Sequence, residues 1–81
     1  MYQTIHEQIR VGGIFEKAEF KPVWFMWNKK HFKINEITLI SDFKDGSIKK
    51  KIFSVLAKDN LYRLDYCPSE YSWFLEQIWV D

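Results

Sequence analysis

Residues 21–34 place apolar-rich stretches on both sides of a polar turn, and this pattern predicts a β-hairpin. A two-residue turn at Asn28-Lys29 places Phe25 opposite Phe32, so that both strands sort their side chains in the same way. One face is apolar and is predicted to join the core: Val23, Phe25, Phe32 and Ile34, with Trp27 at its end. The other face is mixed and fits either more core or a binding surface: Trp24, Met26, His31 and Lys33.

Similar alternation on both sides of this hairpin predicts further strands. Residues 4–11 are expected to form a first strand that ends in a bend or bulge at Gly12-Gly13. Residues 32–40 continue the second arm of the hairpin, with a bulge near Asn35-Glu36 where the period of two is broken. Asp45-Gly46 predicts a turn, and the register of the strands around it stays open.

A second hairpin is predicted with Asp59-Asn60 as its turn, because both residues tolerate positive φ. This turn places Val55 opposite Leu64 on a side that is expected to be core. The same side also holds Phe53, Ala57, Tyr62 and Tyr66. The opposite side pairs Ser54 with Asp65, so at least part of it is expected to meet water.

Residues 71–80 fit both helical spacing and a strand that is apolar on both faces. Their aromatic and β-branched content favours the strand, in which Trp73 and Trp79 are expected to be largely buried. Together the elements predict an all-β fold, a small antiparallel meander of about six strands. Such a sheet would curl into a barrel or roll to hide its edges.

The composition fits one small domain, residues 1–81, with many aromatic side chains that can fill its core. The chain is 47% hydrophobic and contains 7 Phe, 4 Trp and 4 Tyr. Cys67 is the only cysteine, which excludes an internal disulfide, and the first four residues lack the basic and apolar regions of a signal peptide. No apolar run reaches the length of a membrane span. These features predict a soluble cytoplasmic protein without membrane association.

Charge is distributed unevenly along the chain although the formal net charge is only +1. Residues 21–60 hold nine lysines against four acidic residues, whereas residues 61–81 hold one arginine against four acidic residues. One explanation of this pattern is that the lysines keep exposed strand edges from pairing with other chains. Another explanation is a surface that binds anions.

Catalytic and metal-binding constellations are nearly absent from the sequence. Cys67 with His6 or His31 is the only thiol and base pair, and no family signature surrounds the cysteine. The spacing contains neither CxxC nor HxxxH, and Gly12-Gly13 lacks the context of a phosphate loop. The carboxylates that could include an acid and base pair all lie in strand patterns typical of solvated faces: Glu7, Glu36, Asp65 and Glu76. We therefore expect no enzyme, no cofactor and no bound metal.

A set of aromatic and turn positions runs through most of the chain: Pro22, Phe25, Trp27, the basic turn, Phe32, Ile34 and Glu36, then Leu61-Tyr62, and finally Trp73 and Leu75-Glu76-Gln77-Ile78-Trp79. In these positions the chain resembles a family of small uncharacterised bacterial all-β proteins. This chain has Asn28-Lys29-Lys30 where the family's turn is usually Arg-Gly-Arg. The family has no assigned activity. Some of its proteins are encoded near DNA-repair polymerase genes, so the resemblance implies a link to nucleic acid.

Two functions of different classes follow from these patterns. The first is a protein-interaction or accessory module, in which an exposed edge strand pairs with an unknown protein partner or with a second copy of the chain. The protein itself is expected to be a monomer or a weak homodimer. The alternative is an accessory that binds single-stranded nucleic acid by base stacking in a basic groove. The residues expected to bind in either case are Trp24, Lys29, Lys30, His31 and Lys33.

Overall fold

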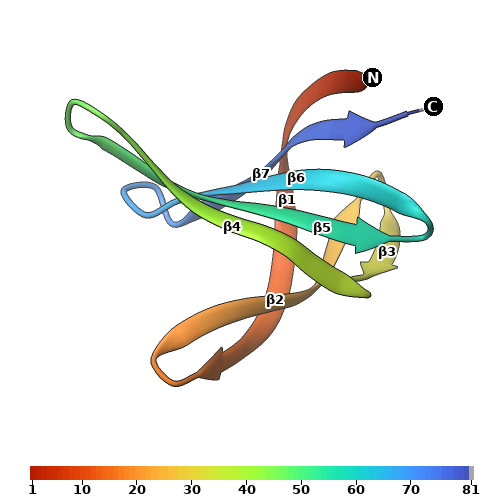
Figure 1. The fold of residues 1–81 in the computed structure, drawn as a ribbon, viewed down its shortest axis with the longest axis horizontal. Coiled ribbons are helices and arrows are strands. Elements are labelled where there is room, and N and C mark those ends of the chain that lie inside the picture. The colour runs from red at the N-terminus through yellow and green to blue at the C-terminus, as the bar shows by residue number, and fades with distance from the viewer. Residues whose placement is uncertain (81) are drawn as a thin grey trace.

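The computed structural model describes residues 1–80, and these contain seven β-strands (Figure 1). They are β1 (Tyr2–Glu16), β2 (Glu19–Trp27), β3 (Lys30–Lys33), β4 (Glu36–Asp45), β5 (Ile48–Ala57), β6 (Asn60–Cys67) and β7 (Ser72–Trp79). The strands form one antiparallel sheet in the order β3-β2-β1-β7-β6-β5-β4. The prediction of an all-β antiparallel fold is confirmed, with seven strands in place of six.

The additional strand arises where residues 32–40 were expected to form one continuous arm. β3 ends at Lys33 after pairing with β2, and β4 begins at Glu36 and pairs with β5. In the link, the Ile34 N–H donates to the Val23 carbonyl at 2.8 Å, and the Asn35 N–H donates to the Leu56 carbonyl at 2.7 Å. The chain thus exchanges one partner strand for another at this point.

β3 and β4 are consecutive in the chain but form the two edges of the sheet. The sheet is therefore not closed into a barrel. The irregularity expected near Asn35-Glu36 is this change of partner, and the register shift of β4 itself lies between Ile37 and Leu39. β4 consequently keeps one side of its backbone without a strand neighbour along ten residues.

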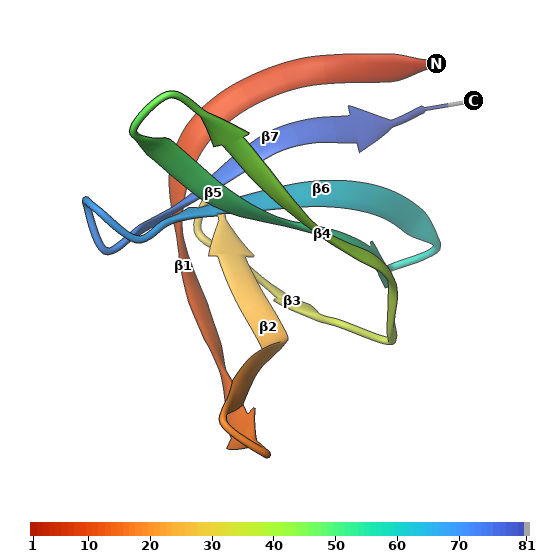
Figure 2. The same ribbon diagram turned by 60° about the vertical axis from the view of Figure 1, so that its left-hand side comes forward.

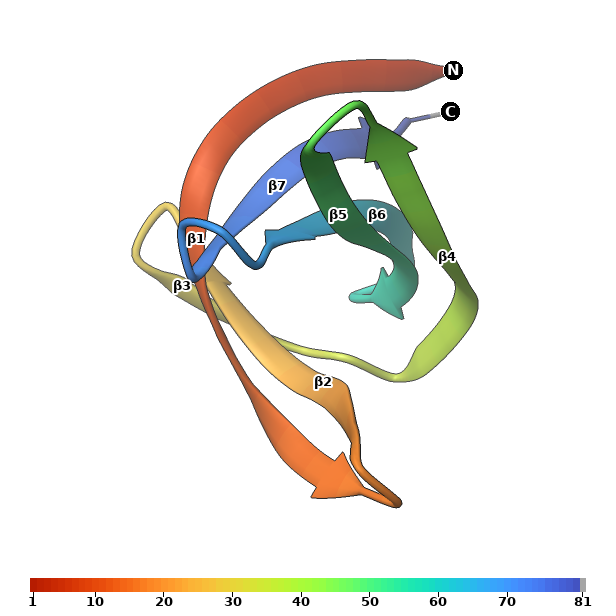
Figure 3. The same ribbon diagram turned by 90° about the vertical axis from the view of Figure 1, so that its left-hand side faces the viewer.

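β1 joins the two halves of the sheet. Figures 2 and 3 show it curving, so that its first half runs along β7 and its second half runs along β2. Its register shifts between Gly12 and Gly13, where a bulge was predicted, and also between Thr4 and Glu7, where His6 has a φ of 52°. The strand extends beyond residues 4–11 at both ends, because its far end continues to a turn at residues 17–18.

The first hairpin has the predicted register. Trp24, Phe25, Met26 and Trp27 pair with Lys33, Phe32, His31 and Lys30 in that order. Asn28 and Lys29 have φ values of 54° and 62°, typical of a two-residue turn whose twist matches that of the strands. Val23 was expected in the core but is exposed, because it lies beside the gap between β2 and β4.

Aromatic packing holds the inner face of the sheet together. The rings of Phe25 and Phe32 stack with centroids 4.8 Å apart, and Tyr62 from β6 meets them edge-on at 5.2 and 5.6 Å. The core draws residues from both halves of the sheet: Ile9, Phe25, Phe32, Ile34, Phe53, Val55, Ala57, Tyr62, Leu64 and Leu75. The apolar face predicted for the first hairpin is thus confirmed apart from Val23.

The second hairpin turns one residue earlier than predicted. Its turn residues are Lys58 and Asp59, with φ values of 47° and 64°, so Val55 pairs with Tyr62 rather than with Leu64. Moving a two-residue turn by one position shifts every cross-strand partner by two residues. A shift of two leaves each side chain on its face, which is why the predicted core side is correct while its pairs are wrong.

Asp65 is fully buried, although at least part of its side of the hairpin was expected to meet water. Its neighbours across the strands are Ile52 on β5 and Phe74 on β7. Arg63 donates two hydrogen bonds to its carboxylate, Nε to Oδ1 at 2.9 Å and Nη2 to Oδ2 at 3.0 Å. The hydrogen bond to Asp65 raises the pKa of Arg63, which favours the charged guanidinium.

The C-terminal segment is a strand, as predicted, but its tryptophans are less covered than expected. Trp73 is half-buried, and Trp79 is 39% exposed near the end of β7. Tyr2 meets Trp79 edge-on at 4.9 Å across β1 and β7, so the two rings cover each other where the core no longer reaches them. No helix in residues 1–80 is long and apolar enough to cross a membrane.

Candidate functional site

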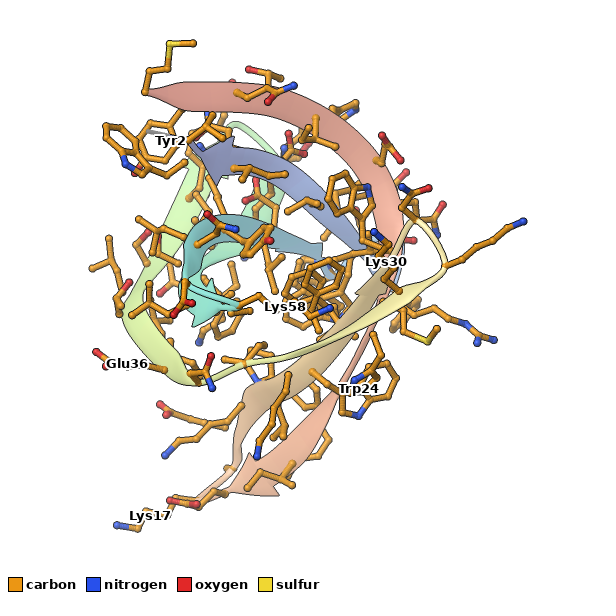
Figure 4. The ribbon with its side chains drawn as sticks, turned by 90° about the vertical axis from the view of Figure 1, so that its right-hand side faces the viewer. Tyr2, Lys17, Trp24, Lys30, Glu36 and Lys58 are labelled. Carbon is orange, nitrogen blue, oxygen red and sulfur yellow. The ribbon has the colours of Figure 1, made fainter. Side chains whose placement is uncertain are left out.

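The outward side of β1, β2 and β3 forms one surface, which we call the hairpin face. Strand pairing sets Gly12 beside Trp24 and Arg10 beside Met26, and it sets Lys33 and His31 beside the same two residues of β2. Figure 4 shows the Trp24 side chain on the outer side of these strands. The hairpin face consists of Arg10, Gly12, Trp24, Met26, His31 and Lys33, with Lys29 and Lys30 in and beside the turn at its end.

Trp24 lies across the backbone of Gly12. A Cβ at Gly12 would lie only 2.1–2.4 Å from three atoms of the indole, so the ring occupies the space that any side chain would need. On its other flank the ring adjoins His31, with ring centroids 5.3 Å apart and an angle of 32° between the planes. Trp24 is half-buried in this position. Because Gly12 has no side chain, the indole can lie directly against the sheet, while part of the ring stays accessible.

The charges around Trp24 are all positive. Arg10, Lys29, Lys30 and Lys33 are exposed, and no residue of the hairpin face is Asp or Glu. Within residues 1–80 none of these four cations makes an ion pair, since the ion pairs there join His6 to Glu76, Lys21 to Glu16 and Arg63 to Asp65. The hairpin face therefore carries a positive potential beside an accessible aromatic ring.

All five predicted binding residues lie on this surface or at its end. The register confirms that Trp24, His31 and Lys33 share one face and that Lys29 and Lys30 lie at the turn. Sequence reasoning missed Arg10 and Gly12, because their place depends on how β1 pairs with β2 across the bulge after Gly12. The alternation of residues 4–11 puts Arg10 on the polar side of its strand but does not indicate which neighbour it meets.

His6, Glu76 and Cys67 line one cavity of about 490 Å³, on the opposite side of the sheet from the core. The His6 ring stacks on Phe74 with centroids 5.5 Å apart, and its Nδ1 lies 2.9 Å from Oε1 of Glu76. Hydrogen bonds within the described chain do not join Cys67 to His6. Burial raises the pKa of the Cys67 thiol, which disfavours the thiolate that a nucleophile requires.

Metal-binding geometry was not expected from the sequence spacing. Across residues 1–80, no group of three or more His, Cys, Asp or Glu side chains could hold a metal ion. His6 with Glu76 supplies at most two ligands, and Cys67 is buried beside them. The described residues thus contain no set comparable to the three or four ligands of a zinc site.

An apolar groove of about 660 Å³ separates the first residues of β2 from β4. It lies where the sheet remains open, and Val23, Leu39 and Ile40 are exposed along it. The unpaired edge of β4 borders this groove, and Phe43 is exposed further along the same strand. An edge with these properties can accept an added strand.

Comparison of the chain with protein-family models, with curated proteins and with solved structures finds no match. The resemblance noted from the aromatic and turn positions therefore stays a prediction. The functional argument rests on the geometry and charge of the surfaces described above.

Proposed function

We propose that the protein binds single-stranded nucleic acid through the hairpin face. The observation that carries this proposal is the indole of Trp24, which lies on Gly12 with part of its ring accessible and with only cationic charges around it. Proteins that bind single strands combine an aromatic stacking surface with cations that follow the phosphates. Each stacked base contributes about 1–3 kcal/mol in such sites.

The positions of the cations suit an extended strand. Arg10 on β1 and Lys33 on β3 lie on opposite sides of β2. Lys29 lies in the turn, and Lys30, which pairs with Trp27, begins β3 on the opposite face from Lys33. The cations thus flank the ring on both sides. A base stacked on Trp24 would have phosphates within reach of Lys33 and Arg10, and Lys29 and Lys30 would contact the strand further along.

An unpaired strand fits this surface better than a duplex does. The hairpin face is a sheet surface with one accessible indole, and a base can stack on it only when its own face is not covered by neighbours in a helix. The hairpin face contains no helix that could enter a major groove, since its residues come from strands and a turn. We extend the proposal to a non-enzymatic accessory role in the cytoplasm, with the link to DNA repair that the family resemblance implies. The buried Cys67, whose thiol pKa is raised, supports the absence of nucleophilic chemistry.

Reversing the charge of Lys29 and Lys30 to Glu should weaken binding of a fluorescein-labelled oligothymidylate by at least about tenfold at low salt, measured by fluorescence anisotropy. In the unmodified protein, one phosphate contact from each of the four cations of the hairpin face predicts a slope of about −3 when the logarithm of the association constant is plotted against the logarithm of the salt concentration. Removing the two contacts of the turn lysines should reduce this slope to about −1.4. Both lysines are exposed, so the free energy of unfolding should change by less than about 0.5 kcal/mol.

The matched control reverses Lys49 and Lys50, which makes the same change in net charge on β5, away from the hairpin face. This variant should keep most of the affinity. If both double variants lose affinity equally, only net charge matters and the assignment of the face is wrong. If the Lys49 and Lys50 variant loses more, the site lies on β5.

The open edge of β4 supports a second candidate, a protein-interaction module that takes an extended segment of a partner into the groove beside β2. The observation that favours this second candidate is the ten-residue edge strand β4, on which Leu39, Ile40 and Phe43 are exposed. Binding there would rely on backbone hydrogen bonds and apolar contacts, so it should respond weakly to salt. Leu39→Lys should abolish such binding and leave oligonucleotide binding unchanged.

A further inference from the structure

An aromatic cavity of about 530 Å³ opens on the inner side of the sheet, away from the hairpin face. Its walls come from β1, β2, β5 and β6, and from β7 with the loop before it. Six aromatic side chains line it: Phe15, Phe20, Phe53, Tyr66, Tyr71 and Trp73. Its volume lies within the range of about 300–1,000 Å³ that is typical of small-molecule sites.

Trp73 is the centre of the aromatic wall. Its ring lies 5.0 Å from that of Tyr66, 5.3 Å from that of Phe53 and 5.8 Å from that of Phe20, at angles of 40–49° between the planes. Gly13 lets Phe20 take its place in the wall, because a Cβ at Gly13 would lie 2.8 Å from the Phe20 ring. The rings are therefore held by strand positions on several sides of the cavity.

Two of the rings stand almost uncovered beside the cavity. The Tyr71 residue is 86% exposed, and Phe15 is 79% exposed. The backbone of Tyr71 has a φ of 52°, in the left-handed region. Large aromatic side chains exposed together beside an apolar cavity are typical of a surface that a ligand covers. A planar ring in the cavity would gain stacking contacts from Trp73 and would cover apolar surface that is now in water.

Among residues 1–80, Lys51 is the only charged residue that lines the cavity. It is half-buried on β5 opposite Tyr66, and its other strand neighbour, Asp42, makes no ion pair with it in the described chain. No carboxylate from the described part of the chain lines the cavity. An ammonium without an acidic partner beside an aromatic cavity attracts an anion and disfavours a cation.

We propose that this cavity binds a small planar aromatic anion, whose ring packs among Trp73 and its neighbours and whose carboxylate or phosphate group meets Lys51. The proposal goes beyond nucleic-acid binding by the hairpin face. The cavity and the hairpin face lie on opposite sides of β1 and β2, so either function could fail without the other.

The test uses three ligands that share one ring and differ in charge: indole-3-acetate, indole-3-acetamide and tryptamine. Binding to the full chain is followed by NMR through the indole N–H resonance of Trp73, assigned by its loss in Trp73→Phe. Indole-3-acetate should bind about tenfold more tightly than tryptamine, with the amide between them, because a hydrogen bond to a charged group changes affinity by about this factor or more. Phenylacetate and phenyl phosphate, measured in parallel, show which anionic group Lys51 prefers.

Lys51→Gln should remove this order while the neutral amide binds as before. The matched control is Lys50→Gln, the adjacent residue on β5, which pairs with Phe43 and does not line the cavity. It should keep the order of the three ligands. The proposal is overturned if tryptamine binds as well as indole-3-acetate, if the two glutamine variants behave alike, or if the ligands shift the Trp24 resonance and leave that of Trp73 unchanged.

Discussion

Phe25→Ala should lower the free energy of unfolding by about 4 kcal/mol, because it removes a fully buried ring that stacks on Phe32 and meets Tyr62. The expected stability of a chain of 81 residues is roughly 4–12 kcal/mol, so this variant should lose between about a third and all of it. Urea titration followed by circular dichroism measures the change.

Met26→Ala provides the matched control on the same strand. Met26 follows Phe25 but points to the hairpin face, where it is half-buried. Its truncation should cost less than about 1.5 kcal/mol, because it leaves no enclosed cavity. Equal losses for the two variants would contradict the assignment of inner and outer faces in β2, on which the candidate site depends.

Arg63→Met should lower the free energy of unfolding by about 3 kcal/mol, since the Asp65 carboxylate would remain buried without the two hydrogen bonds that Arg63 donates. The reason is the cost of an unpaired buried charge rather than the strength of the pair itself. The same urea titration measures this loss.

The double variant Arg63→Met with Asp65→Leu separates these two contributions. Removing both charges should recover most of the loss, because apolar residues of similar size can replace a buried ion pair at little cost. A double variant that is as unstable as Arg63→Met would show that packing of the arginine stem, and not the stranded carboxylate, decides the stability.

The register of the first hairpin could be predicted because two independent features agree. Alternation from residue 21 sets the faces, and Asn28 favours the positive φ that the turn needs. The second hairpin turns at Lys58 and Asp59, although Asp59 and Asn60 are the residue types that favour a turn. Alternation cannot choose between two turns whose registers differ by two residues. Its core side was therefore predictable and its pairs were not.

Other parts of the structure depend on partners that local patterns do not contain. Asp65 is polar and alternates with core residues, yet Arg63 and its neighbours on β5 and β7 cover it completely. The break in alternation near Asn35-Glu36 fits a bulge as well as a change of partner strand, so the open edges could not be foreseen. The lysines and Trp24 of the candidate site follow from the hairpin alone, whereas Arg10 and Gly12 require the pairing of β1 with β2.

The most direct test of the central claim is an NMR titration of the ¹⁵N-labelled protein with an unlabelled oligothymidylate at low salt. The account predicts the largest shift changes at the indole N–H of Trp24, assigned by its loss in Trp24→Phe, and at the backbone amides of Arg10, Gly12 and residues 29–33. These changes should fade as salt is added. Changes confined to β4, or no change at the lowest salt concentration, would contradict the claim that the hairpin face binds single-stranded nucleic acid.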